Sequence, residues 1–241
     1  MFFLFDPMWF LFMIPPFIFM IYAQVKVNSA FKKYSRVRNM HGVTGAEVAG
    51  TLLRDNELDD VRLEQIKTRL GDHYDPRNKV LRLSPEVYST PSVAALGIVA
   101  HEIGHAVQDK SGYAFLRFRT ALVPAANIGS QLGWICVIIG LFLYLLAGEF
   151  GLTVVWGGIF LFAVAVLFSL VTLPVEFNAS SRALHMLRGS GLVSVEEYSG
   201  ARAVLSAAAL TYVAAFFQAL AQLMYFCVAR RRFRPKVAFV S

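Results

Sequence analysis

Residues 120–175 read TALVPAANIGSQLGWICVIIGLFLYLLAGEFGLTVVWGGIFLFAVAVLFSLVTLPV, and Glu149 is the one charged residue among them. The two halves, 120–148 and 150–175, each have the roughly 20 residues that a membrane-spanning helix needs. The junction between the halves, Gly148 to Gly151, is only four residues long. We therefore expect a tight hairpin of two membrane helices.

Two further stretches without Asp, Glu, Lys or Arg lie on either side of this hairpin, at 7–25 and 203–229. Over the whole chain 56% of residues are hydrophobic and 16% are charged, whereas soluble domains carry about 25% charged residues. The first stretch has no basic segment before it and no small-residue cleavage site, so it is expected to stay as an anchor. The sequence therefore predicts a mainly α integral membrane protein with four transmembrane helices.

The charged residues are concentrated between the first and second spans. Residues 26–119 hold 15 of the 23 Lys and Arg and 11 of the 16 Asp and Glu, which is enough polar sequence to form a folded domain. The predicted segments are an N-terminal transmembrane anchor (1–25), a catalytic insertion (26–119), the transmembrane hairpin (120–175), a helix and loop (176–202), a fourth transmembrane helix (203–229) and a basic tail (230–241).

The cations indicate a lipid bilayer rather than a nucleic acid as the partner of this chain. The net charge is +7, but the Lys and Arg residues flank the apolar stretches. Cationic loops tend to be cytoplasmic, so we expect the insertion in the cytoplasm of a multi-pass cell-membrane protein. Four crossings then put the arginine-rich tail outside; the alternative is that 203–229 does not cross. The two cysteines, Cys136 and Cys227, lie in apolar stretches and predict no disulfide framework.

Within the insertion, three kinds of local structure are expected. Thr44 followed by Glu47 predicts a capped helix over 44–56. Residues 61–69 and 79–83 are strand candidates, and the turn-rich segment 71–78 between them predicts a hairpin. A long, almost wholly apolar helix is expected to begin with Thr90 as its cap and to end before Gly112.

That apolar helix contains the sequence His101-Glu102-Ile103-Gly104-His105. Histidines four residues apart on a helix project from one face and can bind one zinc ion. Glu102 lies beside that face, where it can act as general base toward a zinc-activated water. The alternative is a chance pair of histidines, but polar side chains on a buried apolar helix require a compensating interaction.

A catalytic zinc usually has three protein ligands, and the sequence offers two kinds of candidate for the third. One is a remaining histidine, His41, His73 or His185. The other is a glutamate from a later helix, for which Glu176 is the best candidate. The predicted hairpin returns the chain to the membrane face where it left, so Glu176 should lie on the same side as the two histidines.

Five pieces of the sequence together resemble the YugP-type membrane zinc metallopeptidases, which share their plan with the HtpX-like membrane proteases. The pieces are Asp72–Pro76, Leu83-Ser84, Ser92–Gln108, Pro174–Ala183 and Ala207–Ala215. The resemblance implies that His101, His105 and Glu176 bind one Zn²⁺ and that Glu102 is the catalytic base. Related proteases with a glutamate ligand (gluzincins) often carry an aspartate one turn beyond it, which orients a histidine; this chain has Ser180 there.

These observations together predict a zincin-like α+β metalloprotease domain on four membrane helices, which cleaves membrane or membrane-proximal polypeptides. The alternatives are a zinc-dependent hydrolase of an ester or lipid, and a non-catalytic scaffold or transporter. His73 and Tyr74 are candidates for stabilising the oxyanion. The expected edge strand for an extended peptide substrate is Val80, Leu81, Arg82 and Leu83. The sequence specifies neither a regulator nor an oligomeric state.

Overall fold

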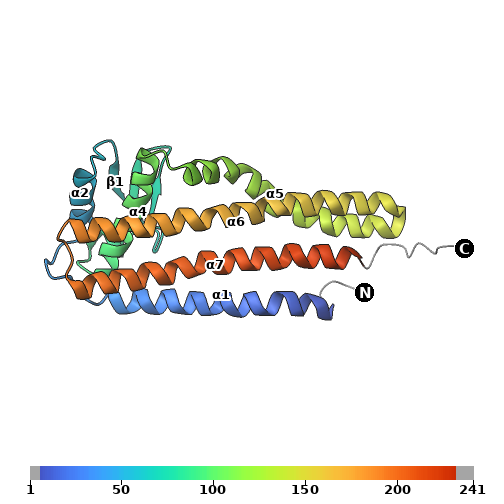
Figure 1. The fold of residues 1–241 in the computed structure, drawn as a ribbon, viewed down its shortest axis with the longest axis horizontal. Coiled ribbons are helices and arrows are strands. Elements are labelled where there is room, and N and C mark those ends of the chain that lie inside the picture. Colours follow the sequence, from blue (N-terminus) through green and yellow to red (C-terminus); the bar gives the residue numbers. More distant parts are fainter. Residues whose placement is uncertain (1–5, 232–241) are drawn as a thin grey trace, which may run out of the picture. The chain divides into compact units, whose positions relative to one another are not determined.

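The computed structural model describes residues 6–231, with side chains as far as Ala229. Helices dominate this part of the chain, and one small sheet accompanies them (Figure 1). The elements in chain order are α1 Pro7–Tyr34, α2 Gly45–Asp55, β1 Arg62–Gln65, β2 His73–Asp75, β3 Val80–Leu83, α3 Pro85–Ser89, α4 Val93–Lys110, α5 Ala114–Ala147, α6 Glu149–Gly189 and α7 Val195–Arg231.

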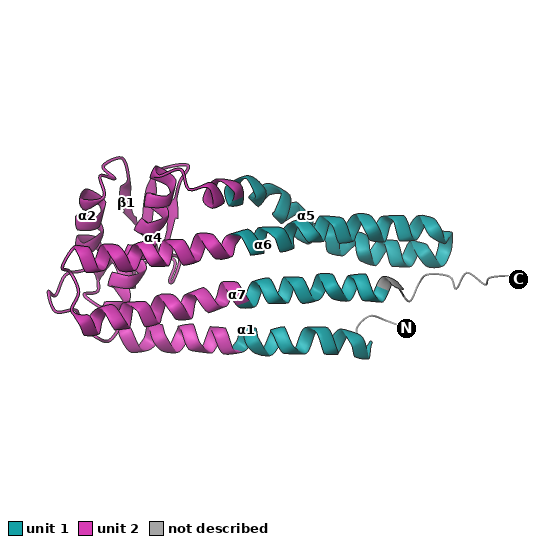
Figure 2. Cartoon of the chain, viewed as in Figure 1, with its two compact units in different colours: residues 1–21, 119–171, 214–241 teal, residues 22–118, 172–213 magenta. Residues whose placement is uncertain are grey.

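The chain divides into two compact units, which Figure 2 shows in different colours. Unit 1 contains residues 1–21, 119–171 and 214–241, and unit 2 contains residues 22–118 and 172–213. Helices α1, α5, α6 and α7 contribute residues to both units. Each unit has a hydrophobic core of its own.

Among the residues that the structure describes, four helices are long and apolar enough to cross a membrane, which matches the predicted number: α1, α5, α6 and the 195–229 part of α7. They extend beyond the charge-free stretches from which they were predicted. Helix α6 continues without a break to Gly189, so Glu176 lies on the same helix as the third apolar stretch. Of the predicted basic tail, the structure describes only the backbone of Arg230 and Arg231.

Within unit 1, glycines allow α5 and α6 to pack closely. A Cβ on Gly140 would lie 2.6 Å from the backbone nitrogen of Val155, and one on Gly133 would lie 3.0 Å from that of Phe162. Small residues at such contacts let the backbones of membrane helices approach each other. The expected helical hairpin is therefore present.

Within unit 2, α4 runs through the hydrophobic core. Leu96, Val99, Ala100 and Ile103 on this helix have no solvent-exposed surface. They pack with buried residues of α2, the sheet, α6 and α7. A helix that is buried almost all round needs apolar residues on every face, as its sequence indicated.

The sheet has the strand order β1-β3-β2, so the expected hairpin of 61–69 with 79–83 is wrong. β1 pairs with β3 in parallel, and β2, which lies inside the predicted turn, pairs antiparallel with β3. The real turn is shorter and is held by Asp75, whose Oδ1 accepts from the backbone N–H groups of Arg77 and Asn78. Tyr74 is buried, and its segment is a strand because residues 73–75 pair with β3.

The helix boundaries match expectation in α2 and differ in α4. Thr44 and Glu47 form the predicted capping box at the start of α2. Helix α4 begins after Ser92, whose side chain accepts from the N–H of Ala95, and not at Thr90. Thr90 instead ends the short helix α3, which the sequence reading did not include. Gly112 follows α4 with φ +63°, as expected of a residue that ends a helix.

Candidate metal centre

His101 and His105 lie one turn apart on α4, and their ring centroids are 4.8 Å apart. Helix α4 meets α6 at this level, because Gly104 lies against the backbone of Ala179. A Cβ at Gly104 would be 2.6 Å from the carbonyl oxygen of Ala179. The glycine inside the motif therefore brings the two histidines to α6.

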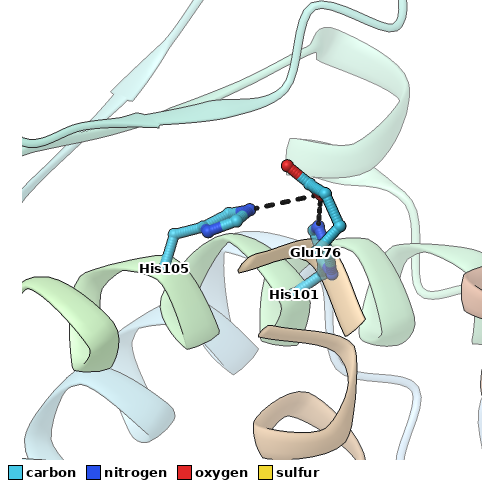
Figure 3. A group of neighbouring side chains, drawn as sticks. All are labelled: His101, His105 and Glu176. Atoms are coloured by element: carbon cyan, nitrogen blue, oxygen red, sulfur yellow. Dashed lines mark hydrogen bonds and ion pairs between the residues drawn. The ribbon is translucent and has the colours of Figure 1, made fainter. Parts of the chain in front are cut away.

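Glu176 on α6 faces both rings (Figure 3). Its Oε2 lies 3.2 Å from Nε2 of His101 and 3.6 Å from Nε2 of His105. The carboxylate is almost fully buried, with 2% of the residue exposed. Two residues from α4 and one from α6, more than 70 positions later in the chain, therefore converge on one point.

The three side chains fit a tetrahedral zinc ion. Their candidate ligand atoms all lie within 4.8 Å of one another. Two ligands at about 2.1 Å from a tetrahedral metal are about 3.4 Å apart, close to the 3.2 and 3.6 Å found between Glu176 and the two histidines. Two imidazoles and one carboxylate are also a donor set that zinc accepts in catalytic sites, where the fourth position stays open.

His101 is held through its second ring nitrogen. The hydroxyl of Ser180 lies 3.2 Å from Nδ1 of His101. Ser180 is one turn beyond Glu176 on α6, where related proteases often have an aspartate. The position thus keeps its contact with the histidine, but with a neutral hydroxyl in place of a carboxylate.

His105 is held by Gln108, a residue that the sequence reading did not single out. Oε1 of Gln108 lies 3.0 Å from Nδ1 of His105, and Gln108 has no exposed surface. Its Nε2 donates to the carbonyl oxygen of Val175 at 2.8 Å and to Oδ1 of Asn178 at 3.0 Å. Gln108 therefore links α4 to the segment of α6 that carries Glu176.

The orientation of the Gln108 amide follows from its partners. Nε of Arg182 can only donate, and it donates to Oδ1 of Asn178 at 2.8 Å. Oδ1 of Asn178 and the carbonyl oxygen of Val175 both accept, so the Gln108 atom that faces them must be the amide nitrogen. Oε1 then faces Nδ1 of His105, which must carry the proton. This leaves the lone pair of His105 on Nε2, the atom that faces Glu176.

Glu102 lies outside the group of three and has a different partner. Its Oε2 accepts a hydrogen bond of 3.0 Å from the backbone N–H of Tyr74 in β2. Burial raises the pKa of the Glu102 carboxyl above its ordinary value, while the neighbouring His101 and His105 act in the opposite direction. A carboxylate held this way, beside the metal ligands rather than among them, can exchange a proton.

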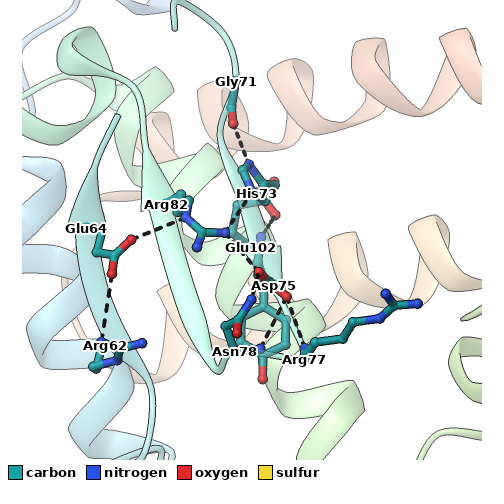
Figure 4. Close-up of polar contacts among 10 residues, drawn as sticks. Arg62, Glu64, Gly71, His73, Asp75, Arg77, Asn78, Arg82 and Glu102 are labelled. Carbon is teal, nitrogen blue, oxygen red and sulfur yellow. Dashed lines mark hydrogen bonds and ion pairs between the residues drawn. The ribbon is translucent and has the colours of Figure 1, made fainter. Parts of the chain in front are cut away.

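Of the two oxyanion candidates, Tyr74 has its hydroxyl engaged elsewhere. The hydroxyl donates to Oδ2 of Asp109 at 2.9 Å, and Lys79 also contacts that oxygen. Burial and this hydrogen bond raise the pKa of the Tyr74 hydroxyl. His73 is exposed, with Nδ1 2.7 Å from the carbonyl oxygen of Gly71 and Nε2 3.5 Å from Arg82 (Figure 4). Of these two residues, it is Tyr74 that contacts Glu102, through its backbone N–H.

The predicted substrate edge, Val80 to Leu83, is not an edge of the sheet. β3 is the central strand and is paired on both sides. Val80, Leu81 and Leu83 are fully buried, and Arg82 pairs with Glu64 and Asp75 in the neighbouring strands (Figure 4). The prediction was wrong because a strand of alternating character can pair on one side or on both. β2 is an edge strand of the sheet, and it lies beside Glu102.

The chain was compared with known families and proteins. Residues 9–231 match the family described as "Putative neutral zinc metallopeptidase". The chain belongs to this family. It is also 43% identical over 205 residues to "Putative membrane protease YugP" of Bacillus subtilis (strain 168), a match that covers 85% of this chain and 88% of that protein. No solved structure gave a significant match. The expected family membership is confirmed.

The polar contacts around the site depend on residues that are distant in the sequence. Gln108 and Asn178 are 70 positions apart, and Tyr74 and Glu102 are 28 apart. One local signal pointed to Gln108: it is a polar residue on an apolar helix, three positions after His105. Asn178 and Arg182 gave a weaker signal, since they lie four residues apart on the helix of Glu176.

Proposed function

We propose that this protein is an integral membrane zinc endopeptidase with a zincin-like catalytic domain. The observation that carries the proposal is the convergence of His101, His105 and Glu176, with Glu102 held beside them. The family description and the membrane-protease relative support it. One bound zinc ion would act as Lewis acid on the substrate carbonyl and lower the pKa of a water to about 7.

The protein's own residues would carry the proton in this reaction. Glu102 would accept a proton from the attacking water and return it to the nitrogen of the leaving amine. The N–H of Tyr74 occupies Oε2 of Glu102, so Oε1 is the oxygen available for that transfer. Ser180 and Gln108 would hold the two imidazoles with Nε2 toward the metal.

For the substrate, we propose that the outer edge of β2 replaces the strand first expected. The N–H of Tyr74 points away from β3, toward Glu102, so β2 presents its outer edge beside the catalytic base. An extended peptide can add to such an edge through main-chain hydrogen bonds. Peptides N-methylated at successive positions should then show an alternating pattern of kcat/KM, since only every second N–H pairs; equal cleavage of all of them would contradict edge binding.

The test of the function uses the full chain in lipid nanodiscs, with zinc measured by mass spectrometry and cleavage measured on casein. Glu102→Gln should keep one zinc per chain and lose turnover by about 100-fold or more. Glu176→Ala should lose both zinc and activity. Glu196→Gln, an exposed glutamate on α7, is the matched control and should behave like the wild type. Full activity of Glu102→Gln would exclude the mechanism.

A second candidate function keeps the zinc but changes the substrate. The same three ligands and base could hydrolyse an ester or a lipid, since Glu176 directly follows the apolar stretch 150–175 in the sequence. Casein or peptide cleavage that is lost on chelation and restored by zinc identifies a peptidase. Chelator-sensitive ester cleavage without peptide cleavage identifies this alternative, and zinc binding with neither activity would favour a scaffold or transporter.

A further inference from the structure

A cavity of about 570 Å³ lies in unit 2, away from the metal ligands. Its walls come from the last turns of α1 and the residues after it, the connection between β1 and β2, α3, and the start of α4. Its lining combines three cations with apolar side chains. The cations are Lys32, Arg36 and Arg69; the apolar residues used below are Leu70, Val87 and Ala95.

The charges of this cavity are not balanced. Arg69 pairs with Glu86 at 2.9 Å, and both residues line the cavity. Lys32 and Arg36 are exposed and four residues apart, and neither has an ion-pair partner in the part of the chain that the structure describes. With three cations and one acid, the cavity carries a net charge of about +2, which favours an anionic ligand.

The apolar part of the lining fits a ligand that also carries a hydrocarbon portion. Leu70 lines the cavity and has 54% of its surface exposed, at a position with φ +53°. Val87 and Ala95 are buried beneath the same cavity. A small inorganic anion would leave the apolar surface of Leu70 in contact with water, whereas the hydrocarbon part of a lipid would cover it.

The position along α1 suits the headgroup layer of a bilayer. The charge-free stretch of α1 ends at Val25, and Lys32 lies seven residues further on, roughly 10 Å along the helix. The polar layer of a leaflet is about 5–8 Å thick beyond the hydrocarbon core, and long cationic side chains reach back toward it. The side chain of Lys32 is therefore within reach of lipid phosphates, and Arg36 follows shortly after the end of α1.

We propose that this cavity binds the phosphate of an anionic phospholipid, with Lys32, Arg36 and Arg69 around the phosphate and Leu70 against the adjoining glycerol and acyl carbons. A phospholipid and a soluble phosphate ester share the phosphate group that these cations would bind. A membrane lipid is favoured over a soluble phosphate by the exposed leucine and by the position next to the first span. The proposal does not depend on the zinc site.

The test is lipid binding by the full-length chain, measured by native mass spectrometry after exchange into phosphatidylcholine nanodiscs with added phosphatidylglycerol. The variant Lys32→Gln/Arg36→Gln removes two cavity cations. The control Lys26→Gln/Lys33→Gln removes the same charge from α1 at lysines that contact the rings of Tyr22 and Tyr34 instead. Glycerol 3-phosphate, added as a soluble competitor, represents the same chemistry without the hydrocarbon.

The cavity variant should bind phosphatidylglycerol about tenfold more weakly or worse, and the control should stay within twofold of the wild type. Arg69→Gln, on a different element, should weaken binding in the same direction; zinc content and melting temperature check the fold of each variant. Equal losses in both double variants, or a loss in neither, would overturn the proposal. If glycerol 3-phosphate occupies the site at micromolar concentration while the lipid does not, the lipid assignment fails.

Discussion

At the scale of the residue, the two histidines of the motif differ in how their second nitrogen is held. Ser180 contacts His101 through a hydroxyl that rotates freely, whereas Gln108 contacts His105 through an amide fixed by two further partners. Partners of this kind set the tautomer and the direction of a metal ligand. Gln108 should therefore matter more for the metal than Ser180.

We expect Gln108→Leu to lower zinc affinity by about 10–100-fold, because Nδ1 of His105 loses its acceptor and α4 loses its link to α6. When zinc is added to saturation, the kcat of the variant should return toward the wild-type value, although its zinc affinity stays lower. Zinc affinity is measured by competition with a chromogenic chelator. Gln65→Leu, at an exposed position of β1, is the control; an unchanged zinc affinity in Gln108→Leu would show that the amide does not position His105.

Gly104 is a second residue at which the structure predicts the effect of a substitution. We expect Gly104→Ala to destabilise unit 2 by about 1–3 kcal/mol, because the new Cβ would lie 2.6 Å from the carbonyl oxygen of Ala179. Zinc binding should fall as well, since α6 carries Glu176. The matched change Gly50→Ala, in helix α2, meets no atom closer than 3.8 Å and should stabilise the protein by about 0.5–1 kcal/mol. Thermal melting of the two variants side by side checks this difference, and equal melting temperatures would contradict it.

At the scale of the element, α4, α6 and β2 together form the site, and Glu176 is the contribution of α6. Helix α4 supplies both histidines and Glu102, and β2 lies beside it with the N–H of Tyr74 on Glu102. The hydroxyl of Tyr74 reaches Asp109 near the end of the same helix. The strand is therefore bonded to the helix at two points, which fixes Glu102 relative to the outer edge of the sheet.

The start of α4 can be tested directly, since the structure moves it from Thr90 to Ser92. We expect Ser92→Ala to cost about 1 kcal/mol of folding free energy, because the N–H of Ala95 loses its acceptor. Thr90→Ala should change stability by less than about 0.5 kcal/mol. Denaturant unfolding of both variants measures the difference. A larger loss of stability for Thr90→Ala than for Ser92→Ala would show that Thr90 caps α4, as the sequence suggested.

At the scale of the whole molecule, charge and hydropathy separate the two units. Residues 26–118 of the polar insertion belong to unit 2, whereas the apolar part of the α5–α6 hairpin, residues 119–171 with Glu149 at the turn, belongs to unit 1. From the cations after the first apolar stretch we predict that the insertion faces the cytoplasm. With four crossings, the α5–α6 turn and the C-terminal tail would face the other side.

This orientation predicts the accessibility of single cysteines. In a chain with Cys136 and Cys227 replaced by serine, Asp59→Cys in the insertion should react with an impermeant maleimide only after the cytoplasmic side is exposed. Glu149→Cys in the turn of the hairpin should react in intact cells; both positions are exposed in the structure. The reverse pattern would invert the topology. A cysteine at Ser241 that labels together with Asp59→Cys would show that the last helix does not cross.

The sequence by itself determined those features that depend on local pattern. Apolar length predicted the four long helices, the spacing of His101 and His105 put them on one helix face, and the helical hairpin brought Glu176 to the same side. The capping box of α2 and the glycine after α4 were also readable, because a cap involves residues three or four positions apart. None of these depends on which distant segments meet.

Only the tertiary structure decided the rest. It placed β3 between two strands instead of at the edge, made a strand of the segment around Tyr74, and put Gln108 between His105 and α6. These features depend on partners outside the local segment: Tyr74 with Asp109 and Gln108 with Val175 are dozens of residues apart, and β1 pairs with β3 across 18 positions. A short strand or a lone buried amide gains its stability from those partners, because its local propensity is weak. The physical reason for the difference is therefore the range of the stabilising contact.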